Sequence, residues 1–464
     1  MLAPAPAPLS PPAPQGEPSL ALPRSFWKDF IKQHWDREPH LFRGLFQSHF
    51  PTTQEIYEAF VEAGERWFRG EYPPNRILRF FIEHLDGPDG IPYYTMIYPT
   101  RKHLPLREDG TMHGYLERVD KWLGGKRFGL TLNRCHAHHW GHWQQMTSFL
   151  SGFYEALGVP LFGNDSTIFL GNYRYTPFGI HKDDLHIFNF IIEGKKTMSL
   201  WPFEQLAQRE EVPKGDPDLI HKPAAVILRD QADEEKLLSQ ATLLHGEPGD
   251  MLYWPASYWH RAEPSPSPFA LTASLGVNFR PPEALGMRMP PLWPGRVKNN
   301  ELPGGRRWQV PASVRNVIKQ QSQRKVVLAA ERDLTAEWTR YLTGAALDGA
   351  PPEAKEAPLT PQEWIRTHPN RPLVSVPLSE GHLLVSGVGR STTLKPSPAV
   401  RRRIDRLVES LNSGKPQQVE ALEQAFFSKL TARAFTRSAF RALLDDLVRW
   451  HAVRRCEAPA ARRR

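Results

Sequence analysis

Cysteine is scarce in this chain of 464 residues, which contains only Cys135 and Cys456. Two cysteines cannot form a disulfide framework, so the composition excludes the small disulfide-rich secreted proteins and makes the reducing cytoplasm the default compartment. The chain also lacks any apolar run approaching the roughly 20 residues that a membrane-spanning helix requires. We therefore expect a cytoplasmic protein that has no membrane partner.

The N-terminus lacks the basic start and the apolar stretch of a signal peptide. It begins MLAPAPAPLSPPAPQGEPSL, and this Pro/Ala-rich composition predicts a disordered tail over residues 1–22. Core-forming residues are plentiful, since 40% of the chain is hydrophobic and 14 residues are tryptophan. This length and composition suit two or three packed domains.

Acidic residues are outnumbered, because 59 Lys and Arg oppose 50 Asp and Glu, which gives a formal net charge of +9. A positive balance favours an acidic partner, such as a nucleic acid or a ribonucleoprotein. Part of the excess lies in basic ends such as the final AARRR. The charge alone therefore does not identify the partner.

The spacing of apolar residues divides the N-terminal two thirds of the chain into helical and β-rich parts. Helices are predicted near residues 25–35, 51–68 and 145–162. An extended segment is expected after Pro39, where the first helical pattern ends. Residues 166–279 alternate short apolar runs with Gly, Pro and Asp, which is typical of a barrel or sandwich of short strands.

Beyond about residue 300 the helical pattern returns. A polar segment with an apolar stripe covers residues 314–342, and a Pro-rich stretch over 348–361 is typical of a linker. The remaining segment combines short extended runs with helices near 398–412 and 434–453. Helices with a small ribbon predict a winged-helix module at the C-terminus.

The polar chemistry concentrates in GIHKDDLHIFNFIIEG, which places His181 and Asp183 at the start of an apolar run. Residues i and i+2 of an extended chain point to the same side, so this imidazole and carboxylate are suited to bind one metal ion. His260, at the end of DMLYWPASYWH, is the candidate third ligand. Two His and one carboxylate that leave open positions are typical of non-haem Fe(II) oxygenases. The alternative is an ordinary turn with solvated polar groups.

Neighbouring polar residues compete with this set. Asp184 follows Asp183 directly, and strand parity predicts that it points away from the site. His186 is expected at the rim of the site. His245, which precedes GEPGD, is the alternative to His260 as the third ligand.

A lysine follows the first two candidate ligands on the next predicted strand, KKTMSLWP, which begins after a turn at Gly194. Lys196 shares one strand face with Met198 and Leu200, while Lys195 lies on the opposite, polar face. Lys196 is therefore expected inside the barrel, where a lysine needs an anionic partner. A bound dicarboxylate would supply one; an exposed hairpin lysine is the alternative.

Together, HxD, EGKK and LWP followed by HGEPGDMLYWPASYWH resemble the cupin-like JmjC 2-oxoglutarate oxygenases. The similarity covers roughly residues 23–290 and is closest to the bacterial ribosomal-oxygenase type and related peptide hydroxylases. It implies a mainly β catalytic core with flanking α-helices, a double-stranded β-helix of the JmjC/cupin jelly-roll type. An α-helical region and a winged-helix domain are expected to follow this core.

This layout divides the chain into four expected parts. They are a disordered tail over 1–22, a JmjC/cupin-like oxygenase domain over 23–295, a helical region with a linker over 296–360, and a winged-helix-like domain over 361–464. The helical region is a candidate for dimerisation, so a homodimer is one candidate assembly. The C-terminal part, from about residue 300 onward, is expected to position the substrate, and dimerisation is the rival role for it.

The resemblance also implies roles for individual residues and three cofactors: Fe(II), 2-oxoglutarate as co-substrate, and dioxygen. The residues that match the family's iron ligands are His181, Asp183 and His260. Lys196 matches the basic residue that pairs with the distal carboxylate of 2-oxoglutarate, and Thr176 matches a hydroxyl that contacts the same carboxylate. A tyrosine found upstream of the first ligand in the family corresponds to either Tyr173 or Tyr175.

The function implied by the resemblance is hydroxylation of a side chain in a protein or peptide, either a ribosomal protein or a ribosomally made peptide precursor. An N-methyl-lysine demethylase is one alternative, against which Asp183 argues because demethylases of this superfamily commonly carry Glu there. A non-catalytic cupin scaffold, with a winged helix that binds nucleic acid or peptide, is the other alternative.

RCHAHHWGHW forms a second polar cluster. Its candidate ligands are Cys135, His136, His138, His139 and His142. The cluster lacks the paired Cys or His spacing of structural zinc sites. We therefore expect a His-rich loop that faces the substrate, with a second metal site as the alternative.

Overall fold

The computed structural model describes residues 20–459, apart from 47–50, 73–76, 86, 88–90, 161–162, 175, 213, 215–222, 265–266, 279–327, 369–370 and 429–434. The predicted tail lies almost wholly outside these residues, and so does the domain boundary expected near residue 295. Within the described part of the chain, no helix is long and apolar enough to cross a membrane.

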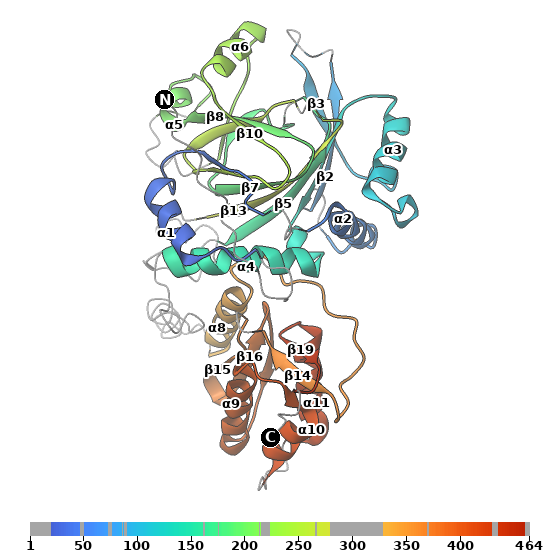
Figure 1. Ribbon diagram of the computed structural model, residues 1–464, viewed down its shortest axis with the longest axis vertical. Coiled ribbons are helices and arrows are strands. Elements are labelled where there is room, and N and C mark those ends of the chain that lie inside the picture. The colour runs from blue at the N-terminus through green and yellow to red at the C-terminus, as the bar shows by residue number, and fades with distance from the viewer. Residues whose placement is uncertain are drawn as a thin grey trace.

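A larger and a smaller antiparallel sheet curl around a common interior in the upper part of Figure 1. The strand order is β1-β11-β7-β13-β5-β4-β2-β3 in the larger sheet and β10-β8-β12-β6-β9 in the smaller one. The larger sheet comprises β1 (His40–Phe42), β2 (Leu78–His84), β3 (Tyr93–Ile97), β4 (Phe128–Asn133), β5 (Asn164–Gly171), β7 (His186–Glu193), β11 (Met251–Trp254) and β13 (Ala270–Val277). The smaller sheet comprises β6 (Ile180–Lys182), β8 (Lys196–Pro202), β9 (Ala224–Val226), β10 (Thr242–Gly246) and β12 (Tyr258–Ala262). The expected jelly-roll core with flanking helices is confirmed.

The helices of this part are α1 (Arg24–Gln33), α2 (Thr53–Phe68), α3 (Met112–Leu123), α4 (Trp140–Leu157), α5 (Phe203–Ala207) and α6 (Gln231–Ser239). Helices α1 and α4 pack on the larger sheet through aromatic rings. Trp27 lies 4.9 Å from Phe149 and Phe149 lies 5.1 Å from Phe188 of β7, measured between ring centroids. Since strand residues alternate between faces, Asn189 of β7 points into the barrel interior instead.

Helix boundaries follow from local caps. Helix α2 begins with a capping box, in which Thr52 accepts from the Glu55 amide and Glu55 accepts from the Thr52 amide. Helix α4 begins at Trp140, earlier than the predicted residue 145, because the His139 imidazole accepts from the His142 amide at 3.3 Å. A histidine cap is not among the usual sequence signals for a helix start.

The larger sheet extends beyond the region predicted to be β-rich, because β2, β3 and β4 all precede residue 166. Strand β4 pairs with β5 along its length, with Leu130 opposite Leu170, and nearly all of its side chains are buried. Burial by sheet partners decides whether such a short segment is a strand, and sequence patterns carry little information about those partners.

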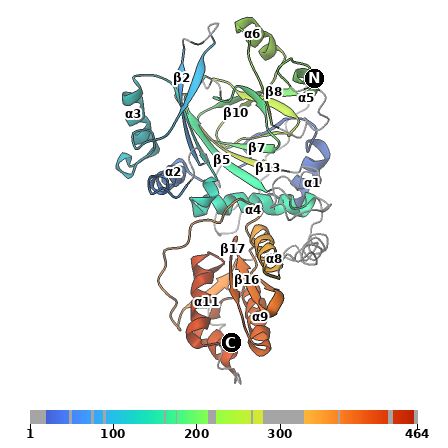
Figure 2. The same ribbon diagram turned by 180° about the vertical axis from the view of Figure 1, so that it is seen from behind.

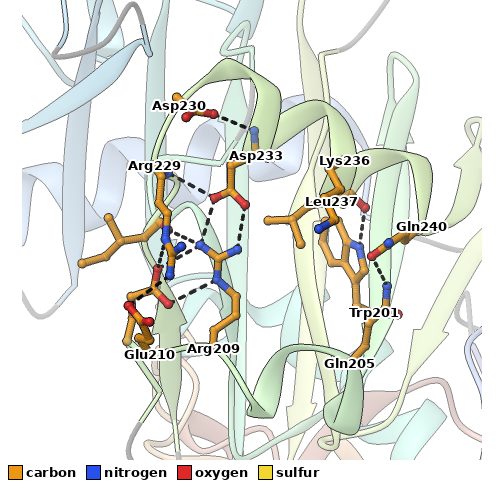
Figure 3. A network of polar contacts seen from close by, with 12 residues as sticks. Trp201, Gln205, Arg209, Glu210, Arg229, Asp230, Asp233, Lys236, Leu237 and Gln240 are labelled. Atoms are coloured by element: carbon orange, nitrogen blue, oxygen red, sulfur yellow. Dashed lines mark hydrogen bonds and ion pairs between the residues drawn. The ribbon is translucent and has the colours of Figure 1, made fainter.

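An insertion between β8 and β10 contains α5, β9 and α6, and a polar network holds it together (Figure 3). The Arg209 guanidinium binds Asp233 at 2.8 and 2.9 Å and Glu211 at 2.9 Å. Strand β9 of the insertion pairs with β6 of the barrel and sets Ala225 opposite His181. The network therefore supports the strand next to the candidate metal ligand.

The C-terminal part contains α8 (Leu328–Thr343), β14 (Trp364–Thr367), β15 (Val374–Pro377), β16 (Leu383–Gly387), β17 (Arg390–Leu394), α9 (Pro398–Asn412), β18 (Gln417–Gln418), α10 (Val419–Phe427), α11 (Arg437–Arg449) and β19 (Val453–Cys456). Helices α9 to α11 accompany the sheet β18-β14-β19, and β15-β16-β17 form a separate meander. These are the kinds of elements that a winged helix contains, and the winged-helix assignment stays a prediction.

Helix α4 lies between the barrel and the C-terminal part in both views (Figures 1 and 2). At its N-terminal end the Trp140 ring stacks on His451, with centroids 3.8 Å apart, and the Arg371 guanidinium lies 5.2 Å from the same ring. Farther along α4, the Tyr154 hydroxyl donates to the Ala345 carbonyl oxygen at 2.6 Å. One helix thus belongs to the packing of both parts.

We expect Arg209→Ala to loosen the insertion, because two partly buried carboxylates lose their guanidinium partner. Removing one member of such a network costs about 1–3 kcal/mol. Amide hydrogen exchange in α6 and β9 should therefore accelerate by about tenfold or more. Lys236→Ala is the matched control, because Lys236 is an exposed basic residue of α6 that takes no part in the ion pairs of Arg209. Unchanged protection in the Arg209 variant would show that other contacts hold the insertion.

Candidate metal centre and pocket

The structure brings His181, Asp183 and His260 together, with one potential ligand atom of each residue within 4.8 Å of the others. His181 lies on β6 and His260 directly opposite it on β12. The Asp183 carboxylate follows β6 and lies 3.6 Å from His260 Nε2. Among the described residues, this is the one group of three or more such side chains close enough to hold a metal ion. Their role as ligands stays a prediction.

Backbone carbonyl groups orient both imidazoles. His181 Nδ1 lies 3.0 Å from the Gly179 carbonyl oxygen, and His260 Nδ1 lies 3.5 Å from the Tyr258 carbonyl oxygen. A carbonyl oxygen only accepts, so the proton of each neutral ring is favoured on Nδ1. The Nε2 lone pair is then available for a metal, as in other His sites whose second nitrogen is held by a hydrogen bond.

Burial favours the neutral, metal-binding form of His260. Burial is the main cause that lowers the pKa of His260 to about 3, and the neighbouring His181 ring lowers it further. The Asp183 carboxylate acts in the opposite direction and raises this pKa. A metal ligand must be deprotonated, and an imidazole with such a pKa is neutral at physiological pH. The ring centroids of the two histidines lie 4.2 Å apart. Such crowding also disfavours a second positive charge.

The two adjacent lysines of β8 and its turn point in opposite directions. Lys196 is 4% exposed, lines the same pocket as the metal centre, and donates from Nζ to the Tyr173 hydroxyl at 2.6 Å. Lys195 pairs with Glu247 at the surface, with 2.7 Å between Nζ and Oε1. Strand parity therefore predicts the faces correctly, while the cofactor role of Lys196 stays a prediction.

Two further candidates for cofactor binding, Thr176 and Tyr173, line the same pocket as Lys196. Thr176 is buried and lines the pocket, and its amide donates to the Ala262 carbonyl oxygen at 3.1 Å. Of the two candidate tyrosines, Tyr173 is the one in contact with Lys196, and its ring centroid is 4.4 Å from the ammonium nitrogen. Tyr175 lies outside the described residues.

The competing polar residues lie elsewhere. Asp184 is buried beside Asn278, whose Nδ2 donates to it at 3.3 Å, and it does not line the pocket. His245 is exposed on β10. The expectation that His186 lies at the rim is wrong, because its ring stacks on Trp35 with centroids 4.0 Å apart and is buried in the core. Aromatic side chains of the N-terminal segment, distant in sequence, decide that position.

The larger sheet contributes a polar wall to the pocket, which has a volume of about 580 Å³. Thr131 Oγ1, Asn189 Oδ1 and Thr272 Oγ1 are buried there without a hydrogen-bond partner among the described residues. Buried polar atoms are normally paired, so this wall suits a polar ligand. The sequence analysis did not identify these residues, although a lone Asn within the apolar run HIFNFIIE is the kind of signal that marks one of them.

The expectation of a substrate-facing His cluster is wrong, because Cys135, His136, His138 and His142 are buried. His136 Nε2 lies 3.0 Å from the Asp348 carbonyl oxygen and Nδ1 lies 2.7 Å from Ser166 Oγ. This histidine therefore links the barrel to the start of the linker. Within the described residues the cluster does not form a metal-binding group of three side chains, so the alternative of a second metal site finds no support.

Residues 141–284 match the model of the cupin-like domain. This region contains His181, Asp183, His260, Lys196 and Thr176. The chain therefore carries a cupin-like domain, as the motifs predict. A comparison with curated proteins found no match.

Among solved structures, the chain is similar to YcfD from Escherichia coli. One X-ray structure of YcfD gives a TM-score of 0.43 at 13% sequence identity, covering 93% of this chain and 98% of that chain. Two structures of YcfD, described as a ribosomal oxygenase, contain cobalt with succinic acid or cobalt with 2-oxoglutarate. Each gives a TM-score of 0.40 at 14% identity, with the same coverage of both chains.

The buried histidines beside α4 predict acid sensitivity. Burial lowers the pKa of His136 to about 4 and that of His138 to about 3, from 6.5. Below about pH 6.5 the unfolded chain therefore binds protons that the folded chain does not, and the free energy of unfolding falls as the pH drops towards about 4. Each such histidine contributes a slope of about 1 kcal/mol per pH unit.

In denaturant titrations between about pH 6.5 and 4, His138→Gln should reduce the slope of the free energy of unfolding against pH by the contribution of one proton. His113→Gln is the control, because the His113 side chain is 65% exposed. A slope for His138→Gln equal to that of the unaltered protein would contradict a neutral buried imidazole at this position.

Proposed function

We propose that the protein is an Fe(II)- and 2-oxoglutarate-dependent dioxygenase that hydroxylates a side chain of a protein or peptide. The observation that carries this proposal is the placement of His181, Asp183 and His260 in one pocket with a buried lysine, Lys196. Two imidazoles and one carboxylate that leave part of the coordination sphere open are the donor set of non-haem Fe(II) oxygenases.

The residues present fit the metal. His181 and His260 sit on paired strands, with backbone carbonyls beside Nδ1, and Asp183 adds the anionic ligand. The donor set is not closed by a fourth His, Cys, Asp or Glu among the described residues, as a structural zinc site would be. Fe(II) bound here would supply open positions for a chelating co-substrate and for dioxygen.

The pocket also fits a dicarboxylate. Lys196 points into it from β8, and its ammonium group has a neutral hydroxyl, that of Tyr173, as hydrogen-bond partner. A buried ammonium group beside a neutral partner favours an added anion. Hydroxyl and amide groups of the opposite wall offer further hydrogen bonds to such a ligand. 2-Oxoglutarate would bind the metal at one end and Lys196 at the other, and would provide the electrons for oxygen activation by its decarboxylation to succinate.

The chain would then bind the metal, orient the co-substrate and exclude water from the reacting groups. The metal ligands fix the reacting centre, Lys196 and Thr176 orient the co-substrate, and the two sheets shield these buried groups from bulk water. The substrate's C–H bond must reach the open side of the pocket. We propose a ribosomal protein or a ribosomally made peptide as substrate, because this is the kind of target that the resemblance of the motifs implies.

We expect His181→Ala and Asp183→Ala to lose most bound Fe(II), because two remaining ligands cannot hold the ion in an open site. Metal content of the purified proteins and succinate formation from 2-oxoglutarate are the measurements. His245→Ala is the matched control, because His245 is exposed on β10, and it should retain metal and turnover. If both variants keep their bound metal and their turnover of 2-oxoglutarate, the metal centre is assigned to the wrong residues.

Lys196→Ala should raise the 2-oxoglutarate concentration needed for half-maximal turnover while Fe(II) binding persists. The loss of a charge-assisted hydrogen bond in a buried pocket costs about 1.5–3 kcal/mol, which corresponds to about 10- to 150-fold in affinity. Lys195→Ala is the control on the other strand face and should change little. An effect of Lys195 that exceeds that of Lys196 would contradict the proposed co-substrate site.

A further inference from the structure

The two strands that carry the proposed histidine ligands both contact the insertion between β8 and β10, but in different ways. Strand β6, which carries His181, pairs directly with β9 of the insertion. Strand β12, which carries His260, lies between β8 and β6 in the smaller sheet. The contacts of β12 with the insertion are therefore made by its side chains.

Side chains of β12 alternate between the metal pocket and the face that the insertion covers. His260 and Ala262 line the metal pocket. Trp259 and Arg261 are buried, and the Trp259 indole donates from Nε1 to the Phe203 carbonyl oxygen of α5 at 3.2 Å. Both residues that flank His260 in the chain thus point away from the metal pocket, and the first of them is held by the insertion.

Arg261 connects β12 to α6 through ion pairs. Its guanidinium donates to Glu263 at 2.9 and 2.8 Å and to Glu234 of α6 at 2.8 Å. On the neighbouring strand β8, the Trp201 indole donates to the Leu237 carbonyl oxygen of α6 at 2.8 Å (Figure 3). A planar guanidinium that binds two carboxylates restricts the position of both partners. Helix α6 is therefore fixed relative to the strand that carries His260.

Stability alone does not explain a charged group at this position. The Arg261 side chain is 1% exposed, and the desolvation of a buried ion pair offsets most of its attraction. An apolar residue on this covered face would stabilise the fold about as well. The best-attested use of a buried ionic group is to fix one arrangement of the elements around it. Here the elements that it joins are β12 and α6.

The His260 ring depends on its strand more than the His181 ring does. His181 Nδ1 lies 3.0 Å from the Gly179 carbonyl oxygen, whereas His260 Nδ1 lies 3.5 Å from the Tyr258 carbonyl oxygen. The second distance is at the outer limit of a hydrogen bond and orients the ring only weakly. The backbone position of β12 must then determine where His260 Nε2 points.

We propose that Arg261 is a positioning residue for the metal centre: together with Glu234 it holds β12 against α6, so that His260 faces His181 at a distance that suits one metal ion. This inference rests on the proposed function, because it assumes the metal centre. Arg261 does not line the metal pocket, so it acts through His260 and is not a catalytic residue. The insertion then supports both histidine strands, β6 by strand pairing and β12 by this ion pair.

The test measures binding of Co(II) to the metal-free, full-length protein by titration followed through visible absorption. Arg261→Met removes the guanidinium but keeps a long side chain. We expect it to raise the Kd for Co(II) about 10- to 100-fold, as substitutions of residues that orient metal ligands do. Glu234→Gln, on the α6 side of the pair and partly exposed, should raise this Kd about two- to fivefold.

A matched control separates positioning from stability. Arg118→Met also removes an arginine that binds one carboxylate through two hydrogen bonds, but Arg118 lies on α3 and pairs with Asp109. In denaturant titrations this variant should lose free energy of unfolding, and it should keep the Co(II) affinity of the unaltered protein. Arg261→Lys, which restores a cation, should recover part of the affinity that Arg261→Met loses.

The outcomes distinguish this inference from the proposed function. If the unaltered protein does not bind Co(II), the proposed metal centre fails, and the role of Arg261 falls with it. If the unaltered protein binds Co(II) and both Arg261→Met and Glu234→Gln bind it equally tightly, Arg261 only stabilises the fold, while the metal centre stands. If Arg261→Met does not fold, Glu234→Gln decides, and an unchanged Kd in that variant overturns the inference.

Discussion

The pairing of β6 with β12, which sets His260 directly opposite His181, is the constraint on which the candidate site depends. A slip of one residue would turn one imidazole to the other face of the sheet. The register is supported on both sides, since β8 pairs Leu200 with His260 and β9 pairs Ala225 with His181. The turn before β8 requires Gly194, because its φ is +74° and a Cβ there would lie 2.1 Å from a carbonyl oxygen. Backbone geometry far from the metal ligands thus determines their separation.

The interior of the barrel favours ligand binding at the expense of stability. Lys196 and the polar wall of Thr131, Asn189 and Thr272 are buried, and buried polar groups cost free energy unless they find partners. An apolar interior would be more stable, as in the aromatic packing of α1 and α4 on the outer face of the larger sheet. Departures from good packing rules are expected at functional sites. Here the buried polar groups line the metal pocket, on the inner faces of both sheets.

Helix α4 connects this pocket to the C-terminal part. One side of the helix packs on the barrel, and its ends contact His451 and Ala345 of the C-terminal part. His136, just before α4, binds the Asp348 carbonyl oxygen and adds a polar contact across the same junction. Because burial lowers the pKa of His136 to about 4, this contact is expected to weaken in acid. A cavity at this junction, lined by Arg134 of the barrel and Asp348 of the linker, therefore has walls that the packing of both parts holds in place.

The sequence by itself determined the strand-rich core and the opposite directions of Lys195 and Lys196, because these depend on the two-residue period of a strand. It also indicated that His181 and Asp183 lie together, although Asp183 lies just beyond the end of β6. It did not determine β2 to β4, the burial of His136 and His186, or the polar wall, because each of these depends on partners distant in the chain. Sequence and tertiary structure both contribute to the choice of His260 over His245. The motif resemblance selected His260, and the pairing of β12 with β6 sets it opposite His181. Tertiary structure alone decided that the metal pocket shares Arg79 and Asp165 with the cavity at the junction, since that cavity forms only when the C-terminal part packs against the barrel through α4.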